Sequence, residues 1–192
     1  MQRSADWAHT RRGRVLTKVR DPTSLRLRTK LLILVAMAVF ATILVLVLDG
    51  SLVRFFSIPS ESMEPTIMVG DKVLVTPGAP TSITRGEVIV FWSSIAGDEN
   101  LIKRVVAVAG DTVEVHAGAL YVSGVRQREP YLRGSVTEGV FPSTTVQPGY
   151  LFVLGDNRNN SYDSRILGQV PTSAVVGRAY AVWWPLWHIR LL

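Results

Sequence analysis

The sequence predicts a mainly β domain of antiparallel strands, preceded by one membrane-spanning helix. Residues 31–48 form an almost uninterrupted apolar run. From residue 51 onward, short segments rich in Val, Ile, Leu and aromatic residues alternate with Gly-Asp and Pro-Gly turns, and no long stretch has a helical period. Such turns between short apolar segments are typical of antiparallel sheets. The 192 residues leave room for one domain of ordinary size beside one membrane segment.

The first 30 residues are strongly basic. They contain nine Lys or Arg residues against two Asp residues, a net charge of +7, whereas the whole chain has +6 and the remainder therefore sums to −1. A basic flank beside an apolar run is typical of the cytoplasmic side of a membrane, where anionic lipid attracts it. We interpret residues 1–30 as a cytoplasmic tail, with the lipid bilayer and no nucleic acid as its partner.

The apolar run is long enough to cross a bilayer. At 1.5 Å per residue, a helix over residues 31–48 extends about 27 Å, and Thr42 is its one polar residue. A cleaved signal peptide also combines a basic and an apolar segment, but its apolar part is shorter, and no small-x-small site follows Leu48. We therefore predict a retained transmembrane helix over 31–48 and an extracytoplasmic β-rich domain over 49–192.

Seven segments of this domain are predicted strands, because β-branched and aromatic residues dominate them between turn signals. They are residues 72–76, 87–92, 101–109, 112–116, 119–122, 150–154 and 175–184. Residues 126–147 are more polar and are predicted to be an excursion from the main sheet, a long loop. The sequence contains no cysteine, so disulfides and thiolate chemistry are excluded and the fold depends on packing alone.

Histidine-based and metal-based chemistry finds no support in the sequence. His9 lies in the predicted cytoplasmic tail, while His116 and His188 stand in no catalytic motif and are interpreted as surface or packing residues. The chain has no His-Glu-x-x-His spacing, no Gly-x-Ser-x-Gly elbow and no Ser-x-x-Lys motif. We predict neither a metal nor a cofactor.

Ser62 and Lys103 form a candidate nucleophile and base. A serine hydroxyl is a weak nucleophile until a nearby base removes its proton. In the strand over 101–109, side-chain alternation places Lys103 in one row with Leu101 and Val105, and burial among apolar neighbours would favour the neutral amine. A lysine whose ammonium reaches solvent also fits this position, and the periodicity alone favours that alternative.

Four motifs follow the apolar run in order. They are residues 58–66 (IPSESMEPT), Gly70-Asp71, the stretch from Ile102-Lys103-Arg104-Val105 to Gly110-Asp111, and residues 155–165 (GDNRNNSYDSR) with Gly168 just beyond. Together they resemble the type I (leader) signal peptidase family of bacteria, from the apolar run to about Trp184. A lone Ser-Met pair would be weak support, but four ordered motifs behind an N-terminal span are specific.

The resemblance implies roles for several of these residues. Ser62 would attack the scissile carbonyl carbon and Lys103 would take its proton. Ser161 would hydrogen-bond to the lysine amine and orient it, while the Ser62 backbone N–H and the Ser60 hydroxyl would hold the oxyanion. Asp163 and Arg165 would form a structural ion pair that braces the site.

The family also implies small apolar pockets for alanine-sized side chains of the substrate. Ile58, Met63 and Ile102 match the residues that line these pockets, although each fits the core equally well. Five aromatic residues similarly fit either a membrane interface or the core: Phe55, Phe56, Trp183, Trp184 and Trp187.

The expected activity is that of a serine endopeptidase of the bacterial plasma membrane, which cleaves signal peptides from exported precursor proteins after a small-x-small site. The precursor would bind as an extended strand beside the sheet, and the span would raise its effective concentration. The enzyme is expected to be a monomer. Two alternatives remain: a self-cleaving peptidase of the related repressor type, and a non-catalytic tethered β domain that binds exported chains.

Overall fold

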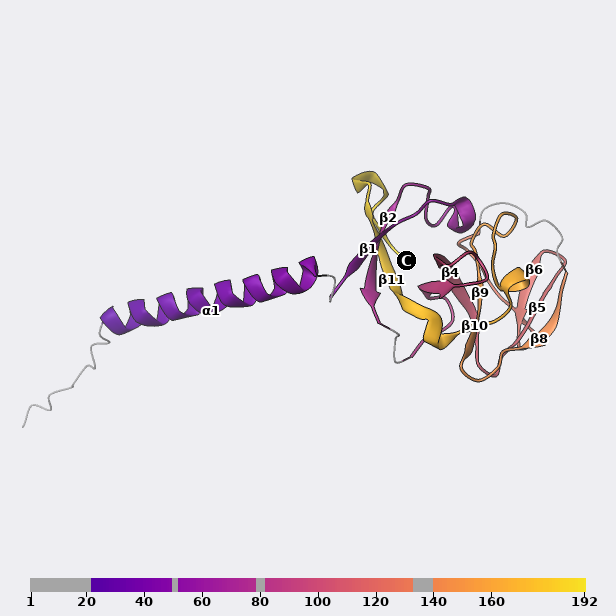
Figure 1. The fold of residues 1–192 in the computed structure, drawn as a ribbon, viewed down its shortest axis with the longest axis horizontal. Coiled ribbons are helices and arrows are strands. Elements are labelled where there is room, and N and C mark those ends of the chain that lie inside the picture. The colour runs from indigo at the N-terminus through magenta and orange to yellow at the C-terminus, as the bar shows by residue number, and fades with distance from the viewer. Residues whose placement is uncertain (1–21, 50–51, 79–81, 133–139) are drawn as a thin grey trace, which may run out of the picture. The chain divides into compact units, whose positions relative to one another are not determined.

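The computed structural model describes residues 22–49, 52–78, 82–132 and 140–192 (Figure 1). The chain forms two compact units, one up to Leu44 and one from Val45 to the C-terminus. The described part of the first unit is helical, and the second is built almost entirely of antiparallel strands. The mainly β fold class with one N-terminal apolar helix is therefore confirmed.

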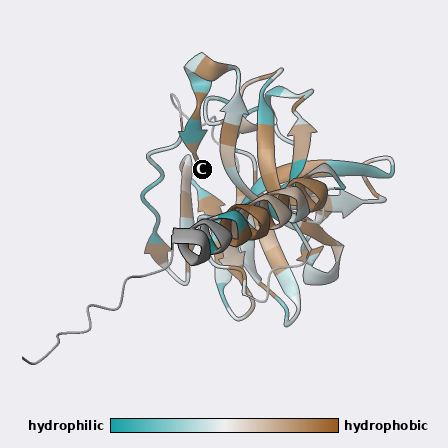
Figure 2. Ribbon diagram, turned by 90° about the vertical axis from the view of Figure 1, so that its left-hand side faces the viewer, coloured by the Kyte–Doolittle hydropathy of each residue, from teal (hydrophilic) through white to brown (hydrophobic). Residues whose placement is uncertain are grey.

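Helix α1 extends from Pro22 to Leu48, nine residues further upstream than the apolar run. Proline suits the first turn of a helix, because the N–H that it lacks would have no partner there. Residues Arg28–Val47 are long and apolar enough to cross a membrane by length and composition, and Figure 2 shows hydrophobic residues along the helix. The hydroxyl of Thr42 donates to the carbonyl of Ala38, so its polar group is satisfied within the helix.

The larger sheet has eight strands, in the order β1-β2-β11-β3-β4-β9-β10, with β12 added beside β11. All of its pairs are antiparallel. Its strands are β1 (Arg54–Ser57), β2 (Lys72–Pro77), β3 (Val88–Ser93), β4 (Glu99–Val108), β9 (Tyr150–Leu154), β10 (Val170–Pro171), β11 (Val175–Trp184) and β12 (Arg190–Leu191).

The smaller sheet has four antiparallel strands in the order β7-β6-β5-β8. They are β5 (Thr112–His116), β6 (Ala119–Val122), β7 (Val125–Arg126) and β8 (Phe141–Thr145). Figure 1 shows β5, β6 and β8 together at one end of this unit, away from β1, β2 and β11. The described residues also form four short helical segments: η1 (Glu61–Met63), α2 (Ser164–Leu167), η2 (Thr172–Ala174) and η3 (Leu186–His188).

Four of the predicted strands have the observed bounds, and the other three differ by one or two residues at their ends. The region 126–147 is not only a loop, because it contains strand β8. This strand escapes prediction because it is the edge strand of the smaller sheet, where Pro142 and Ser143 are exposed and polar residues are tolerated.

Among the described residues the apolar core forms three clusters, of which one bears directly on the candidate site. Met63 and Ile67 are fully buried in a cluster with residues of β2, β3 and β11, so the segment between β1 and β2 is fastened to the main sheet. The aromatic residues near the domain ends are mostly exposed: Trp187 is 87% accessible, and Phe55, Trp183 and Trp184 are 39–50% accessible. Phe56 packs partly buried against the same cluster.

Candidate active site

Ser62 lies in a closed loop, residues 58–71, that joins β1 to β2; we call it the Ser62 segment. The Ile58 N–H donates to the carbonyl of Asp71 at 3.0 Å, and the Gly70 N–H donates to the carbonyl of Ile58 at 2.8 Å. These two bonds close the base of the loop. Gly70 has φ +88°, a left-handed conformation that favours glycine. Ser62 itself is buried within the single turn of η1.

Lys103 lies on β4 and reaches Ser62 across 41 positions of sequence. Its Nζ is 2.8 Å from Ser62 Oγ and 3.0 Å from the carbonyl oxygen of Ile102. Its cross-strand neighbour is Ile89, which is fully buried, as is Val105 two residues along the strand. The predicted apolar row is therefore present. The alternative of a solvated ammonium is wrong, because only 2% of Lys103 is accessible.

Burial lowers the pKa of the Lys103 amine from 10.5 to about 8, because the charged form loses its hydration. The carboxylates of Asp163, Glu99 and Asp156 oppose this shift by favouring the ammonium. An amine with a pKa near 8 is neutral in an appreciable fraction of molecules near neutrality. It can therefore remove a proton from a hydroxyl that lies within hydrogen-bond distance.

Ser60 lies at the N-terminal end of η1, beside Ser62. Its Oγ is 3.3 Å from Ser62 Oγ, and the residue is exposed to solvent. The structure thus brings together three of the four serine and lysine side chains that the sequence singled out. A hydroxyl at this position can donate a hydrogen bond toward a group that reacts with Ser62.

Ser161, the fourth residue, lies in the loop after β9 and does not make the expected bond to Lys103. Its Oγ is buried and has no hydrogen-bond partner among the described residues. The hydroxyl packs against Gly155 instead: a β-carbon built on Gly155 would overlap Ser161 Oγ and would lie 2.6 Å from Ser161 Cβ. Ser161 thus lies against Gly155 and is not hydrogen-bonded to Lys103 in this structure, so its orienting role stays a prediction.

The loop after β9 is attached to the Ser62 segment. The Asn157 N–H donates to the carbonyl of Ser62 at 3.0 Å, and its side-chain amide donates to the carbonyl of Glu61 at 3.1 Å. The Asn160 side-chain amide donates to the Glu61 carboxylate at 3.2 Å. The Ser62 segment is thereby fixed both by the closure of its own loop and by bonds to the loop after β9, which is distant in sequence.

Asp163 and Arg165 form the expected ion pair. Arg165 Nε and Nη2 contact the two carboxylate oxygens of Asp163 at 2.8 and 2.9 Å. Asp163 is fully buried and also accepts the Gly155 N–H at 3.1 Å and the Arg165 N–H at 3.2 Å. The pair therefore shapes the loop that presents Ser161.

A second buried ion pair, to which the sequence assigned no role, joins β4 to this loop. Arg104 Nε and Nη2 lie 2.8 and 2.7 Å from the two Asp156 oxygens, and Arg104 Nη1 donates to the carbonyl of Gly86 at 2.7 Å. The guanidinium also lies 4.2 Å from the centroid of the Tyr131 ring. In the sequence, Arg104 and Asp156 each lie in one of the four motifs, but no sequence pattern indicates that they pair.

A narrow cavity of about 100 Å³ lies between the Ser62 segment and β4. Ile58 and Ile102, two of the three residues expected to line a substrate pocket, line this cavity together with Ser60 and Lys103. Met63 does not line it: the side chain is fully buried in the core cluster, so the core alternative holds for this residue. Glu99, at the start of β4, also lines this cavity.

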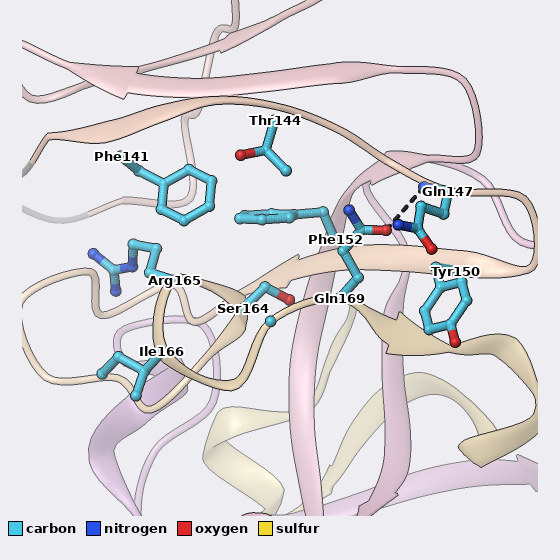
Figure 3. A pocket seen from close by; sticks show the side chains of 10 residues that line it. Phe141, Thr144, Gln147, Tyr150, Phe152, Ser164, Arg165, Ile166 and Gln169 are labelled. Atoms are coloured by element: carbon cyan, nitrogen blue, oxygen red, sulfur yellow. Dashed lines mark hydrogen bonds between the residues drawn. The ribbon is translucent and has the colours of Figure 1, made fainter.

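The described part of the chain contains no cluster of His, Cys, Asp or Glu side chains suited to a metal ion. His116 lies 3.4 Å from Glu114 and stacks on Tyr121, as expected of a surface residue. A larger cavity of about 440 Å³ lies between β8, β9 and α2 (Figure 3). Phe141, Phe152 and Arg165 are among its lining residues, but neither Ser62 nor Lys103 is.

Known proteins resemble this chain over most of its length. It is 37% identical to a probable signal peptidase I-2 of Synechocystis, over 70% of this chain and 65% of the relative. It is also 37% identical to signal peptidase I of Pseudomonas aeruginosa, over 74% of this chain and 69% of the relative. It is 34% identical to signal peptidase IB of Staphylococcus aureus, over 76% and 85%. The chain thus spans slightly less than two thirds of the Synechocystis relative.

A crystal structure of a signal peptidase I from Enterococcus faecalis V583 is 32% identical and superposes with a TM-score of 0.45, over 51% of this chain and 97% of that one. The family profile described as "Signal peptidase, peptidase S26" matches residues 31–184, which is most of the sequence. The chain belongs to the signal peptidase, peptidase S26, family.

Proposed function

We propose that this protein is a membrane-anchored serine endopeptidase that cleaves signal peptides from exported precursor proteins, with Ser62 as the nucleophile and Lys103 as the general base. The observation that supports the proposal most directly is the 2.8 Å separation of Lys103 Nζ and Ser62 Oγ. Family membership supports the reaction class, and the lowered pKa of the buried amine supports the role of Lys103.

The reaction would begin with transfer of the Ser62 hydroxyl proton to the neutral Lys103 amine as the oxygen attacks the scissile carbonyl carbon. The tetrahedral intermediate has a negatively charged oxygen, which the Ser62 N–H and a reoriented Ser60 hydroxyl would stabilise. The Lys103 ammonium would then donate its proton to the departing amine. A water molecule activated by the same amine would hydrolyse the acyl-enzyme and release Ser62.

The substrate would bind as an extended strand along β4. Residues 99–104 of β4 pair with β3, but pairing with β9 begins only at Arg104, so the other edge of residues 99–103 has no partner strand within the described ranges. Residues 99–103 also line the cavity to which Ile58 contributes. Backbone hydrogen bonds would fix the register of the peptide, and the small volume of the cavity would favour alanine-sized side chains.

Helix α1 would hold the enzyme in the same bilayer as its precursor substrates. The nine basic residues before the apolar run, six of which precede residue 22 and fall outside the described residues, support a cytoplasmic N-terminus and an extracytoplasmic β domain. Tethering both molecules to one surface would raise their effective concentration without any additional contact. Exposed aromatic side chains such as Trp187 would suit the lipid interface on the same side.

Cleavage of a purified precursor with an Ala-x-Ala site by the full-length protein in detergent tests this function. Ser62→Ala and Lys103→Met are expected to lower kcat by at least about 10³-fold, because each removes a group that acts in the bond-breaking step. Ser94→Ala and Lys72→Met, at exposed positions, are the matched controls and should retain full activity.

Three results would contradict the proposal. Full activity in either site variant would exclude the Ser62–Lys103 pair as the catalytic machinery. Loss of the protein itself on incubation without a precursor would indicate a self-cleaving peptidase. Capture of precursors without turnover from neutral to alkaline pH would indicate a binding domain.

A further inference from the structure

The last seven residues, which we call the C-terminal strap (186–192), run from η3 through β12. They lie beyond the region that the family profile matches, which ends at Trp184. From His188 onward their accessibility alternates: His188, Arg190 and Leu192 are partly buried, whereas the side chains between them are exposed. The exposed residues of the strap are Leu186 at 64%, Trp187 at 87%, Ile189 at 59% and Leu191 at 86% accessibility.

His188 contacts the base of the Ser62 segment. Its Nδ1 lies 2.8 and 3.0 Å from the two carboxylate oxygens of Asp71, which is only 2% accessible. The same carboxylate accepts the Met68 N–H at 2.8 Å, and the Asp71 carbonyl accepts the Ile58 N–H. His188 therefore contacts Asp71, the last residue of the segment, which is hydrogen-bonded to Ile58, its first residue.

Arg190 contacts the same segment three residues after Ser62. Its Nη2 donates to the carbonyl of Pro65 at 2.8 Å. Leu192 adds an apolar contact, because it packs against the cluster that contains Met63 and Ile67. The inward-facing residues of the strap thus reach the Ser62 segment at Asp71, at Pro65 and in the core beneath η1.

The strap is itself fastened to the main sheet. Arg190 and Leu191 of β12 pair with Val182 and Ala181 of β11, and the Leu192 N–H donates to the carbonyl of Tyr180 at 3.0 Å. Because β11 is an interior strand of that sheet, between β2 and β3, the strap is anchored on a rigid element. It can therefore oppose displacement of the segment to which His188 and Arg190 are bonded.

We propose that His188 and Arg190 are positioning residues, which hold the Ser62 segment so that Ser62 Oγ stays within reach of the Lys103 amine. The inference rests on the proposed function for its catalytic consequence, but not for the contacts themselves. A displacement of about 1 Å at a reacting atom can lower a rate by about 10²-fold. Neither residue touches the reacting groups, so their effect is transmitted through Asp71 and Pro65.

The test compares His188→Leu with His188→Asn and Arg190→Met with Arg190→Lys, all in the full-length protein in detergent. Asparagine retains an N–H donor near the position of Nδ1, and lysine retains a donor for the Pro65 carbonyl. Ile189→Ser, an outward-facing change in the same strap, is the matched control. Two quantities are measured: kcat and KM for precursor cleavage, and hydrogen exchange of the backbone amides of residues 58–71.

His188→Leu and Arg190→Met are expected to lower kcat by about 10- to 100-fold with a much smaller change in KM. Both variants should also accelerate amide exchange in the Ser62 segment. His188→Asn and Arg190→Lys should retain most of kcat. Ile189→Ser should leave both the kinetic constants and the amide exchange unchanged.

Unchanged amide exchange in His188→Leu and Arg190→Met would overturn the inference, as would equal loss of kcat in the conservative variants or in Ile189→Ser. If the wild-type protein cleaves no precursor, the proposed function fails, whereas the exchange data still decide whether the strap holds the segment.

Discussion

Gly155 lies directly against Ser161, with no room between them for a side chain. A β-carbon on Gly155 would also overlap the carbonyl oxygen of Ser62. The loop after β9 can therefore lie this close to the Ser62 segment only because residue 155 is a glycine and has no β-carbon. Because Asn157 bonds to the same Ser62 carbonyl, this close approach fixes the position of the nucleophile candidate relative to the loop.

Gly155→Ala is expected to reduce both stability and activity. The added methyl group must displace Ser161 or the Ser62 backbone, and overpacking of this kind costs about 1–3 kcal/mol. Thermal unfolding and precursor cleavage would measure the two effects. Gly124→Ala is the control: it has φ +76° and open space around its Cα, so it should lose about 1 kcal/mol from backbone strain without loss of activity. Full activity of Gly155→Ala would contradict the importance of this contact.

The rate of cleavage should rise with pH through the pKa of Lys103. The neutral amine is the active base, and burial lowers its pKa to about 8, so the protonated, inactive form dominates below that value. A profile of kcat/KM from pH 6 to 10 should therefore increase about tenfold per unit on its acidic limb and level off above pH 8. A flat profile between pH 6 and 8 would show that no group with such a pKa controls the reaction.

Breaking the Arg104–Asp156 pair should destabilise the domain strongly. Both side chains are almost inaccessible, and removal of one partner leaves a buried charge without compensation, at a cost of about 3–5 kcal/mol. Arg104→Met and Asp156→Asn should both show this loss in denaturant unfolding. Arg85→Met removes a more exposed ion pair with Asp111 and should cost no more than about 1 kcal/mol. Similar losses in all three variants would contradict the assigned importance of burial.

Ser161→Ala should separate stability from catalysis. The Ser161 hydroxyl is buried without a hydrogen-bond partner among the described residues, so its removal should leave the free energy of unfolding unchanged or raise it. If the hydroxyl turns to the Lys103 amine when substrate binds, kcat should nevertheless fall. Chemical denaturation and single-turnover cleavage would test the two halves, and an unchanged kcat would exclude an orienting role for Ser161.

Local patterns in the sequence were sufficient for much of this fold. Strands β5, β6, β9 and β11 have the predicted bounds, because β-branched residues and flanking turns specify a strand without reference to the rest of the chain. The alternation along β4 likewise placed Lys103 in an apolar row. The four ordered motifs identified the candidate serine and lysine residues and the Asp163–Arg165 pair, whose members are only two positions apart.

Only the tertiary structure determines whether the candidate site residues contact one another and whether the Lys103 amine is buried from solvent. The bonds from Lys103 to Ser62, Arg104 to Asp156 and His188 to Asp71 join positions 41, 52 and 117 residues apart. Such pairs depend on strand order, since β4 lies between β3 and β9, and β11 lies between β2 and β3. Periodicity assigns a side chain to one face of a strand, but only the neighbouring segments determine what covers that face. Burial of the Lys103 amine, and hence its lowered pKa, is for this reason a property of the assembled fold.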